Sequence, residues 1–298
     1  MGLFKSKRDE TLKQDLSKRD NSTGAVFIIR LLMDRPCEMP SQKTMSEAMT
    51  RHLGMTDCVS YDKEIAGFSP KRFKLHLEKE NKDIPPLLSV MKCSSIKTPL
   101  MDNIARTQLW DCKNADAILS SCKYEVVATD MLAACLDYRD RADMLVGFIE
   151  ALVEMFPSCK AVLFENSKKM LTREKVLNCK LPKESRFIYY AVNVRFFNIK
   201  GGNDMLVDTL GMSTLFMPDL QYHFHGLEPN SVVNHAYNVL SYMFENANPV
   251  KSGDYIDGIK NGKISEAVQW KVQYENSLIQ PVRQVIDVNM GQFASGKR

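Results

Sequence analysis

The stretch DYRDRADMLVGFIEALVEMFP, residues 137–157, predicts one long amphipathic helix. Its apolar side chains recur at intervals of three and four residues, which places them on one side of a helix. Pro157 ends the pattern because proline cannot continue a helix. A helix with one apolar side has to pack against another layer, so the stretch predicts a layered fold. The stripe consists of Met144, Leu145, Phe148, Ile149, Leu152, Val153 and Phe156.

The segments around this helix predict strands. AVFIIRLLM (25–33), YEVVATDM (124–131) and KAVLFE (160–165) are short apolar runs rich in β-branched residues. PSQKTMSEAMTRHLG (40–54) predicts a further helix, with Ser41 as its N-cap and Gly54 at its end. This order predicts the α+β class, with antiparallel or mixed sheets and helices packed on one face. A ferredoxin-like arrangement is the simplest instance for the N-terminal half.

The second half continues the alternation. RFIYYAVNVRFFNI (186–199) predicts a strand because it is rich in aromatic and β-branched residues, and LQYHFH (220–225) predicts another. PNSVVNHAYNVLSYMFEN (229–246) predicts a helix. DNIARTQLWDCKNADAILSSC (102–122), in the first half, also predicts a helix, with Trp110 as a core anchor.

The domain prediction has three parts. Residues 1–22 mix both charge signs with few apolar residues and predict a charged flexible tail. Residues 23–180 form an N-terminal α+β half, and residues 181–298 form a C-terminal α+β half. The two halves are alternatively one continuous domain, because no low-complexity linker separates them.

Composition narrows the functional class. The 298 residues are 44% hydrophobic and 26% charged, with a net charge of +4, as expected for a globular protein without a nucleic-acid partner. No apolar run has the length of a transmembrane helix or a signal peptide, which predicts a cytoplasmic location. None of the eight cysteines lies in a Cys-x-x-Cys pair, so the common zinc spacing is absent.

The N-terminus offers a membrane alternative. Met1, Gly2 and Ser6 fit the N-myristoylation pattern, and Lys5 and Lys7 begin a basic cluster. One acyl chain with basic charge supports reversible membrane attachment. The pattern is short, so a solvated tail is the preferred interpretation and membrane binding is not expected.

Three of the five histidines lie close together in the sequence. In LQYHFH, His223 and His225 share one face of the predicted strand, because side chains alternate along a strand. Asp219 and His235 are candidates to complete a metal site with them. The alternation equally fits the solvated face of an amphipathic strand, with His235 on the polar side of its helix. A third interpretation is a surface for a ligand or partner.

The common catalytic motifs are absent. The chain has no Gly-x-Gly-x-x-Gly, no phosphate loop and no Gly-x-Ser-x-Gly. We therefore predict no cofactor and assign no catalytic residue.

Several segments resemble a bacterial family, domain of unknown function 4261 (DUF4261). They are residues 109–157, FIYYAVNVRFF (187–197), DMLVDTLGMSTLFMPDLQYHFHGLEP (204–229) and SGDYIDG (252–258). The likeness extends from about residue 25 to the end and is most specific at 208–212 and at Pro218-Asp219. STLFMPD departs from the usual SALGLPD, because Phe216 replaces a glycine. The resemblance implies a bacterial cytosolic α+β protein and supplies no activity, cofactor or catalytic residue.

Three functional hypotheses follow. The first is a non-enzymatic interaction protein, immunity-like or a stress accessory, whose partner is another protein. The second is a metal-dependent enzyme or metal-binding protein that uses the His223/His225 strand. The third is a peripheral membrane protein anchored at Gly2.

Overall fold

The computed structural model describes residues 26–77 and 81–296, which divide into two compact units. The N-terminal unit contains the described residues up to Asn193 together with Gly211–Phe216. The C-terminal unit contains Val194–Leu210 and the described residues from Met217 onwards. The contacts therefore divide the chain after Asn193, whereas the sequence favoured a division near residue 180. The predicted tail, residues 1–22, lies outside the described residues.

The N-terminal unit is built on an eight-stranded sheet of order β10-β9-β1-β8-β6-β3-β2, with β7 also paired to β8. Its pairs are antiparallel. The strands are β1 (Ile28–Met33), β2 (Thr56–Tyr61), β3 (Ile65–Pro70), β6 (Leu87–Met91), β7 (Ser94–Ser95), β8 (Tyr124–Met131), β9 (Cys159–Phe164) and β10 (Lys169–Thr172). A separate pair consists of β4 (Leu75–Leu77) and β5 (Lys82–Ile84).

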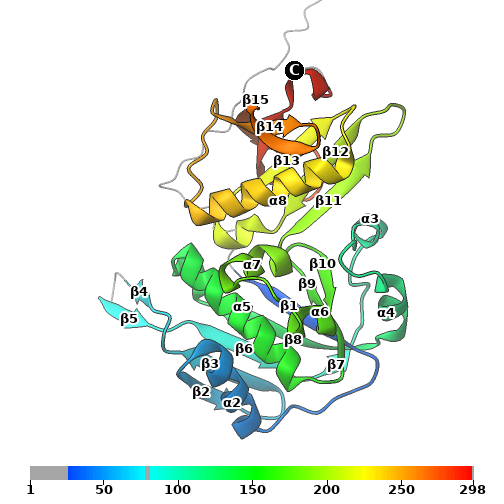
Figure 1. Ribbon diagram of the computed structural model, residues 1–298. Helices are drawn as coiled ribbons and strands as arrows, with labels where there is room; N and C mark the ends of the chain where they lie inside the picture. The colour runs from blue at the N-terminus through cyan, green and yellow to red at the C-terminus, as the bar shows by residue number, and fades with distance from the viewer. Residues whose placement is uncertain (1–25, 78–80, 297–298) are drawn as a thin grey trace, which may run out of the picture. The chain divides into compact units, whose positions relative to one another are not determined.

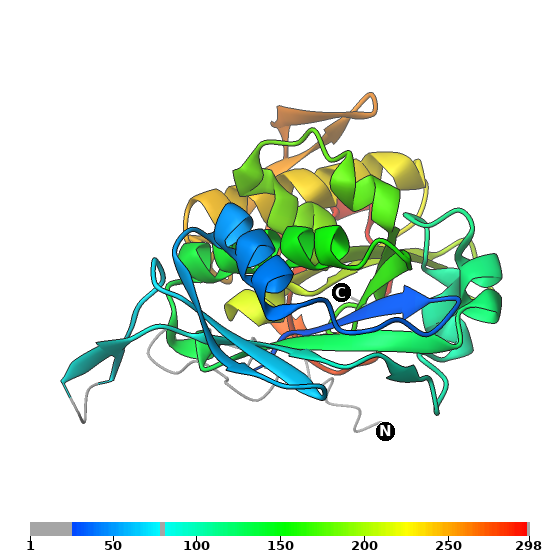
Figure 2. The same cartoon turned by 90° about the horizontal axis from the view of Figure 1, so that it is seen from below.

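The helix predicted at 137–157 is α5 (Tyr138–Met155), which lies beside α2 (Gln42–Leu53) on one face of this sheet (Figure 2). Asp137 caps α5 by accepting the Arg139 N–H at 2.9 Å. Gly147 allows α2 to approach closely, because a Cβ there would lie 2.8 Å from the His52 carbonyl oxygen. Two further helices complete this layer, α6 (Arg173–Leu177) and α7 (Lys183–Ala191), and both contact α5.

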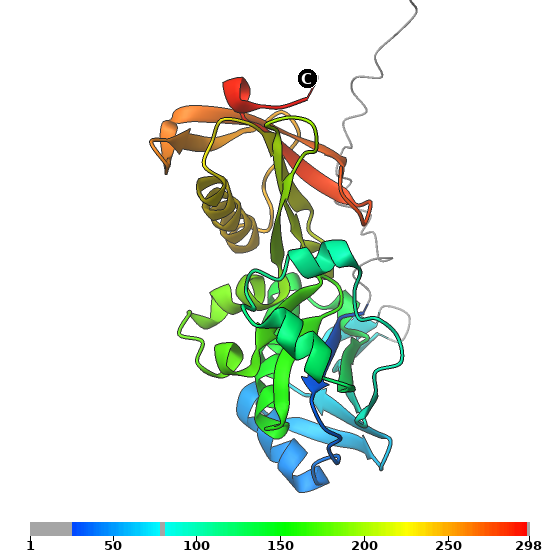
Figure 3. The same cartoon turned by 90° about the vertical axis from the view of Figure 1, so that its right-hand side faces the viewer.

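The segment predicted as one helix at 102–122 forms two short helices, α3 (Asn103–Thr107) and α4 (Ala115–Ser121) (Figure 3). Side chains from this segment, such as Leu109, pack against Leu32 and Met170 of the sheet. Leu32 alternates with Leu31 and Met33, so this segment covers the face opposite α5. Trp110 is 59% exposed, and its prediction as a core anchor was wrong.

These elements confirm the α+β class. Two crossovers, β1-α2-β2 and β8-α5-β9, each connect strands that are not neighbours in the sheet. A ferredoxin-like sheet has this kind of crossover, but here β3 and β6 also stand between β2 and β8. The ferredoxin-like detail therefore stays a prediction.

The C-terminal unit has a mixed six-stranded sheet of order β11-β12-β13-β16-β15-β14. β13 and β16 are parallel, whereas β12–β13, β15–β16 and β14–β15 are antiparallel. α8 (Pro229–Glu245) lies along the sheet and contacts β12, β13 and β14 (Figure 1). The strands are β11 (Asn193–Asn198), β12 (Met205–Leu210), β13 (Asp219–Phe224), β14 (Tyr255–Lys260), β15 (Lys263–Asn276) and β16 (Gln284–Asn289).

Three short 3₁₀ helices complete the described elements: η1 (Ala133–Cys135), η2 (Met212–Leu215) and η3 (Gly291–Phe293). None of the helices in the described part of the chain combines the length and the apolar character needed to cross a membrane.

The strand predicted at 186–199 was half wrong, because its first part is α7 and its second part is β11. Aromatic and β-branched residues favour strands. However, the buried residues Phe187, Tyr190 and Ala191 are spaced by three and four positions, which is the spacing of one side of a helix. Pro182 stands at the N-cap of α7, where its missing N–H is not needed. Spacing therefore outweighs composition in this segment.

Candidate functional site

The polar face of β13 is buried at its first two positions, where a solvated strand face was one interpretation, and is partly exposed at His223. Asp219 is 1% exposed and Gln221 is completely buried. Both are covered by the connection between β15 and β16, residues 277–283, which we call the 277–283 loop. The Leu278 N–H donates to Gln221 Oε1 at 2.7 Å, and Arg283 Nε donates to Asp219 Oδ2 at 2.9 Å. The loop therefore converts one face of the sheet into a polar interior.

A row of polar side chains crosses three strands beneath this loop. Asp208 on β12 lies opposite Gln221 on β13, which lies opposite Asp287 on β16. Residues directly opposite each other on paired strands share a face of the sheet. Gln221 Nε2 donates to Asp287 Oδ1 at 2.9 Å, and all three side chains are fully buried. The loop thus rests on a fixed polar floor.

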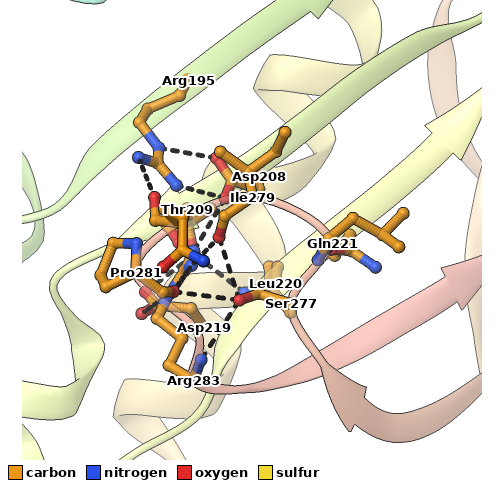
Figure 4. Close-up of polar contacts among 12 residues, drawn as sticks. Arg195, Asp208, Thr209, Asp219, Leu220, Gln221, Ser277, Ile279, Pro281 and Arg283 are labelled. Carbon is orange, nitrogen blue, oxygen red and sulfur yellow. Dashed lines mark hydrogen bonds and ion pairs between the residues drawn. The ribbon is translucent and has the colours of Figure 1, made fainter. Parts of the chain in front are cut away.

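Two arginines neutralise Asp208 of this floor and the neighbouring Asp219 (Figure 4). Arg195, on β11, donates to both oxygens of Asp208, at 2.8 and 2.5 Å. Arg283 donates from Nη2 to Asp208 Oδ2 at 2.8 Å while its Nε binds Asp219. Two positive and two negative charges therefore meet with 6% or less of each side chain exposed. We call Arg195, Asp208, Asp219 and Arg283 the buried ionic cluster.

The environment keeps Arg283 charged although it is buried. Burial alone would lower the pKa of Arg283, but the negative charges of Asp219 and Asp208 outweigh it and raise the pKa. Thr209 completes the surroundings of Asp219, because its hydroxyl donates to Asp219 Oδ1 at 3.0 Å and accepts the Leu220 N–H at 2.9 Å. Buried charges tolerate low-dielectric surroundings only with such complete pairing.

The cluster and its neighbours hold the backbone of the 277–283 loop at several carbonyls. Arg195 Nη1 donates to the Gln280 carbonyl at 3.0 Å, and Arg283 Nη1 donates to the Pro281 carbonyl at 3.0 Å. The Ser277 hydroxyl lies 3.0 Å from the Ile279 and Pro281 carbonyls. Each bond removes conformational freedom from a segment without regular secondary structure. The loop is therefore held in one conformation from below.

The outer side of the same loop is apolar and exposed. Leu278 is 56% exposed and Val282 is 60% exposed. Single exposed apolar residues are ordinary on protein surfaces. Here two of them stand on a short backbone whose inner side is bound to buried charges. This combination makes the 277–283 loop the candidate functional site.

The predicted histidine candidates occupy different surroundings. His223 is half-buried, with Nε2 3.7 Å from Asp204 Oδ2. His225 is exposed, and its Nδ1 lies 3.1 Å from the Ser295 hydroxyl. His235 is buried on the other face of the sheet, where it contacts Tyr222. The structure therefore separates His235 from His223 and His225.

His235 was expected on the polar side of its helix and is instead part of the core. Its Nε2 donates to the Asp257 carbonyl at 2.7 Å, and its Nδ1 lies 3.0 Å from the Tyr222 hydroxyl. Its ring also contacts Trp270, with centroids 5.0 Å apart. Burial lowers the pKa of His235, although the hydrogen bond to Asp257 opposes the change. A neutral histidine that bonds through both nitrogens has no nitrogen available for a metal ion.

The metal hypothesis gains no support from this arrangement. Asp219 is bound by Arg283 and Thr209 rather than placed beside a histidine. Among residues 26–77 and 81–296, no three His, Cys, Asp or Glu side chains gather into a group able to hold a metal ion. Of the four candidates, Asp219 alone belongs to the candidate site.

Sequence reasoning missed three of the four cluster residues: Arg195, Asp208 and Arg283. One signal was available for Asp208, because this acid interrupts the apolar strand MLVDTL. A charged residue inside an apolar strand is unusual unless it is paired. No local pattern marks Arg195 or Arg283, since their partners lie on other strands.

The region that contains the candidate site is similar to a known protein family. Residues 208–289 match the family described as Domain of unknown function (DUF4261), which confirms the resemblance over this segment. The matched segment contains Asp208, Asp219, Arg283 and the whole 277–283 loop. The chain has no significant match among the curated proteins or among the solved structures.

Proposed function

We propose that the protein is a non-enzymatic interaction module that binds another protein through the 277–283 loop. One observation carries the proposal: Leu278 and Val282 are exposed on a backbone that is bound to the buried ionic cluster. A binding segment that is already ordered loses less conformational entropy when its partner binds. A few residues in well-packed, desolvated pockets near the centre of an interface contribute most of the binding energy in many complexes.

The energetics of the cluster favour this role over simple stabilisation. Removing charges from water is costly, and buried ion pairs commonly add little net stability compared with well-packed apolar residues. Their geometry, in contrast, is strict, since each arginine must satisfy several acceptors at once. The cluster is therefore better explained as a device that fixes the loop conformation than as a source of folding energy.

The loop predicts the chemistry of the partner surface. Leu278 and Val282 present branched aliphatic groups, and the arginines beneath them are buried and neutralised. A matching partner offers an apolar pocket rather than an acidic patch. Because the loop is short, we expect its contact to lie at the centre of a larger interface.

The test uses a matched pair of surface variants. Leu278→Asp combined with Val282→Asp places charge on the loop, and Ile264→Asp places charge on another exposed residue of the same unit. Proteins cross-linked to the wild-type chain in its native host are identified, purified and titrated against all three proteins. We expect the loop variant to bind more than about tenfold more weakly and Ile264→Asp to bind like wild type.

The proposal fails if the purified partner binds the loop variant as tightly as wild type, or if cross-linking yields no partner that binds the purified chain. Circular dichroism and melting of both variants establish that they are folded before the comparison. An immunity-like or stress-accessory role within this proposal stays a prediction from the sequence. Lipid anchoring at Gly2 also stays a prediction, since that residue lies outside the described part of the chain.

A further inference from the structure

The N-terminal unit contains a pocket of about 660 Å³ between α6, the connection that follows it, and α7. The pocket is widely open to solvent, and its volume is sufficient for a small ring compound. Leu181 and Tyr189 supply apolar and aromatic wall, while Lys175 and Lys180 supply positive charge. Neither the family likeness nor the 277–283 loop assigns a role to this pocket, because both concern other parts of the chain.

Tyr189 is backed by a buried cation. Lys169 Nζ lies 5.4 Å from the centre of the Tyr189 ring. The same ammonium group donates to the Val192 carbonyl at 2.8 Å and pairs with Asp111 Oδ2 at 3.0 Å. A cation beside an aromatic ring attracts its π-electrons. Tyr189 is partly exposed in the pocket wall, so its ring offers an aromatic surface for the ring of a ligand.

The charges of the pocket wall favour an anion. The wall contains two lysines, Lys175 and Lys180, and one carboxylate, Glu174. Lys175 Nζ is 3.9 Å from Asp111 Oδ1, at the outer limit of an ion pair, and Asp111 also pairs with the closer Lys169. The Lys175 ammonium group is therefore held loosely and is able to contact a ligand. Two ammonium groups match a phosphate monoester, which carries a charge of about −1.5 to −2 at neutral pH.

We propose that this pocket binds a small aromatic phosphate monoester. The ring packs against Tyr189 and Leu181, and the phosphate contacts Lys175 and Lys180. This inference is independent of the proposed function, because the pocket and the 277–283 loop lie in different units. Ligand binding in the pocket can be correct if protein binding through the loop is wrong, and the reverse also holds.

The probe is phenyl phosphate, titrated into the full-length protein and followed by backbone amide chemical shifts. Phenol and inorganic phosphate are the controls, since each carries half of the proposed ligand. We expect saturable shifts at residues 174–181 and at Tyr189, with binding of phenyl phosphate at least about tenfold tighter than binding of either control. Adding salt weakens the binding because the contacts to the lysines are partly exposed.

Substitutions locate the site. Lys175→Gln combined with Lys180→Gln is expected to weaken phenyl phosphate binding by at least about tenfold, corresponding to about 1.4 kcal/mol. Tyr189→Leu keeps an apolar wall and is expected to weaken binding through loss of the ring. Lys97→Gln, at an exposed position outside the pocket wall, is the matched control and is expected to change nothing. Unchanged amide shifts elsewhere establish that each variant is folded.

Three results would overturn the proposal. The first is the absence of saturable shifts up to about 10 mM phenyl phosphate, because binding weaker than that is too weak for a specific site. The second is binding of phenol as tight as that of phenyl phosphate. The third is undiminished binding by the double lysine variant.

Discussion

Both units bury an arginine against an aspartate, but the two arrangements hold different things. In the N-terminal unit, Arg141 on α5 donates to Asp130 Oδ2 at 3.0 and 2.8 Å, and also to the Thr214 carbonyl at 2.7 Å. The Phe27 N–H donates to the other Asp130 oxygen at 2.5 Å. Each of these partners is buried. In the C-terminal unit, the buried ionic cluster instead holds the exposed 277–283 loop.

The comparison teaches that buried charge alone does not identify a functional site. Arg141 and Asp130 join the start of α5, the end of β8 and the 211–216 segment. Their role is therefore to hold parts of the fold together. Burial raises the pKa of Asp130, although the charge of Arg141 opposes it, so the pair is costly to desolvate. What distinguishes the C-terminal cluster is the exposed apolar loop that it orders.

The largest effect is expected from breaking the structural pair. Asp130→Asn leaves Arg141 buried without its charged partner, which is expected to reduce the free energy of unfolding by about 3–5 kcal/mol. Urea denaturation followed by circular dichroism measures the loss. Asp116→Asn, which breaks the exposed pair with Arg106, is the control and is expected to unfold like wild type. A loss in Asp130→Asn no larger than in the control would contradict the structural role.

Breaking the functional cluster is expected to cost less. Asp208→Asn removes the negative charge shared by Arg195 and Arg283 and leaves one acceptor oxygen, but Arg283 keeps Asp219. We expect a loss of about 2–4 kcal/mol in the C-terminal unit. The fluorescence of buried Trp270, recorded in a Trp110→Phe background, reports unfolding of this unit alone. A loss larger than that of Asp130→Asn would contradict the expected order of the two effects.

A half-buried charge network in the N-terminal unit gives a smaller, pH-dependent effect. His52 on α2 bonds Glu154 Oε2 at 2.8 Å and lies 3.6 Å from Glu150, with Arg51 and Arg186 nearby. The interaction with the Glu150 carboxylate raises the pKa of His52, burial opposes the increase, and Glu154 adds to it. This stabilisation is complete below the ordinary histidine pKa of 6.5 and is lost as pH rises through the raised value.

The two glutamates set the acidic limit of the same contribution. Burial alone would raise the pKa of Glu150 and of Glu154. The interactions with His52 outweigh burial and lower both pKa values. Their contribution is present above the ordinary value of 4.5 and is lost as pH falls through the lowered values. We expect wild type to lose about 0.5–1 kcal/mol between pH 6 and pH 8 relative to His52→Gln. Parallel curves for the two proteins would contradict the assignment.

The smallest effect is expected at Phe216, beside the structural pair. Its φ of 55° lies in the left-handed region, which glycine adopts without strain. Its ring lies 5.6 Å from the Arg141 guanidinium. Phe216→Gly relieves backbone strain but loses this contact, so we expect a net change within about 1 kcal/mol. Phe216→Ala keeps the strain and loses the ring, and its melting temperature is expected to be lower than that of Phe216→Gly.

Elements with a strong periodic pattern could be predicted from the sequence. The stripe of α5, the apolar side of α8 and the alternation in β13 each depend on neighbouring residues, so local reasoning located them. The segment 186–199 failed because its composition favoured a strand while its spacing favoured a helix over its first part. Trp110 failed because large aromatic residues are usually buried, and only packing decides the exceptions.

The candidate site depends on contacts that no local pattern contains. Gln221 belongs to an alternating strand, and its side chain accepts a hydrogen bond from the Leu278 N–H of the loop, 57 residues away in the chain. Arg195 and Arg283 reach Asp208 across 13 and 75 residues. Of the cluster, the sequence offered only Asp219 as a candidate, and then as a metal ligand; Asp208, the two arginines and the exposed loop became apparent only in three dimensions.

Amide hydrogen exchange of the 277–283 loop tests the central claim most directly. The central claim is that the buried ionic cluster fixes the conformation of the loop. In wild type we therefore expect slow exchange at two loop amides: that of Leu278, which is bonded to Gln221, and that of Ser277, which is bonded to the Arg283 carbonyl. In Asp208→Asn, measured where the unit stays folded, both amides are expected to exchange faster while β14 and β15 are unchanged. Rapid, unprotected exchange of the loop in the wild-type protein would contradict the account.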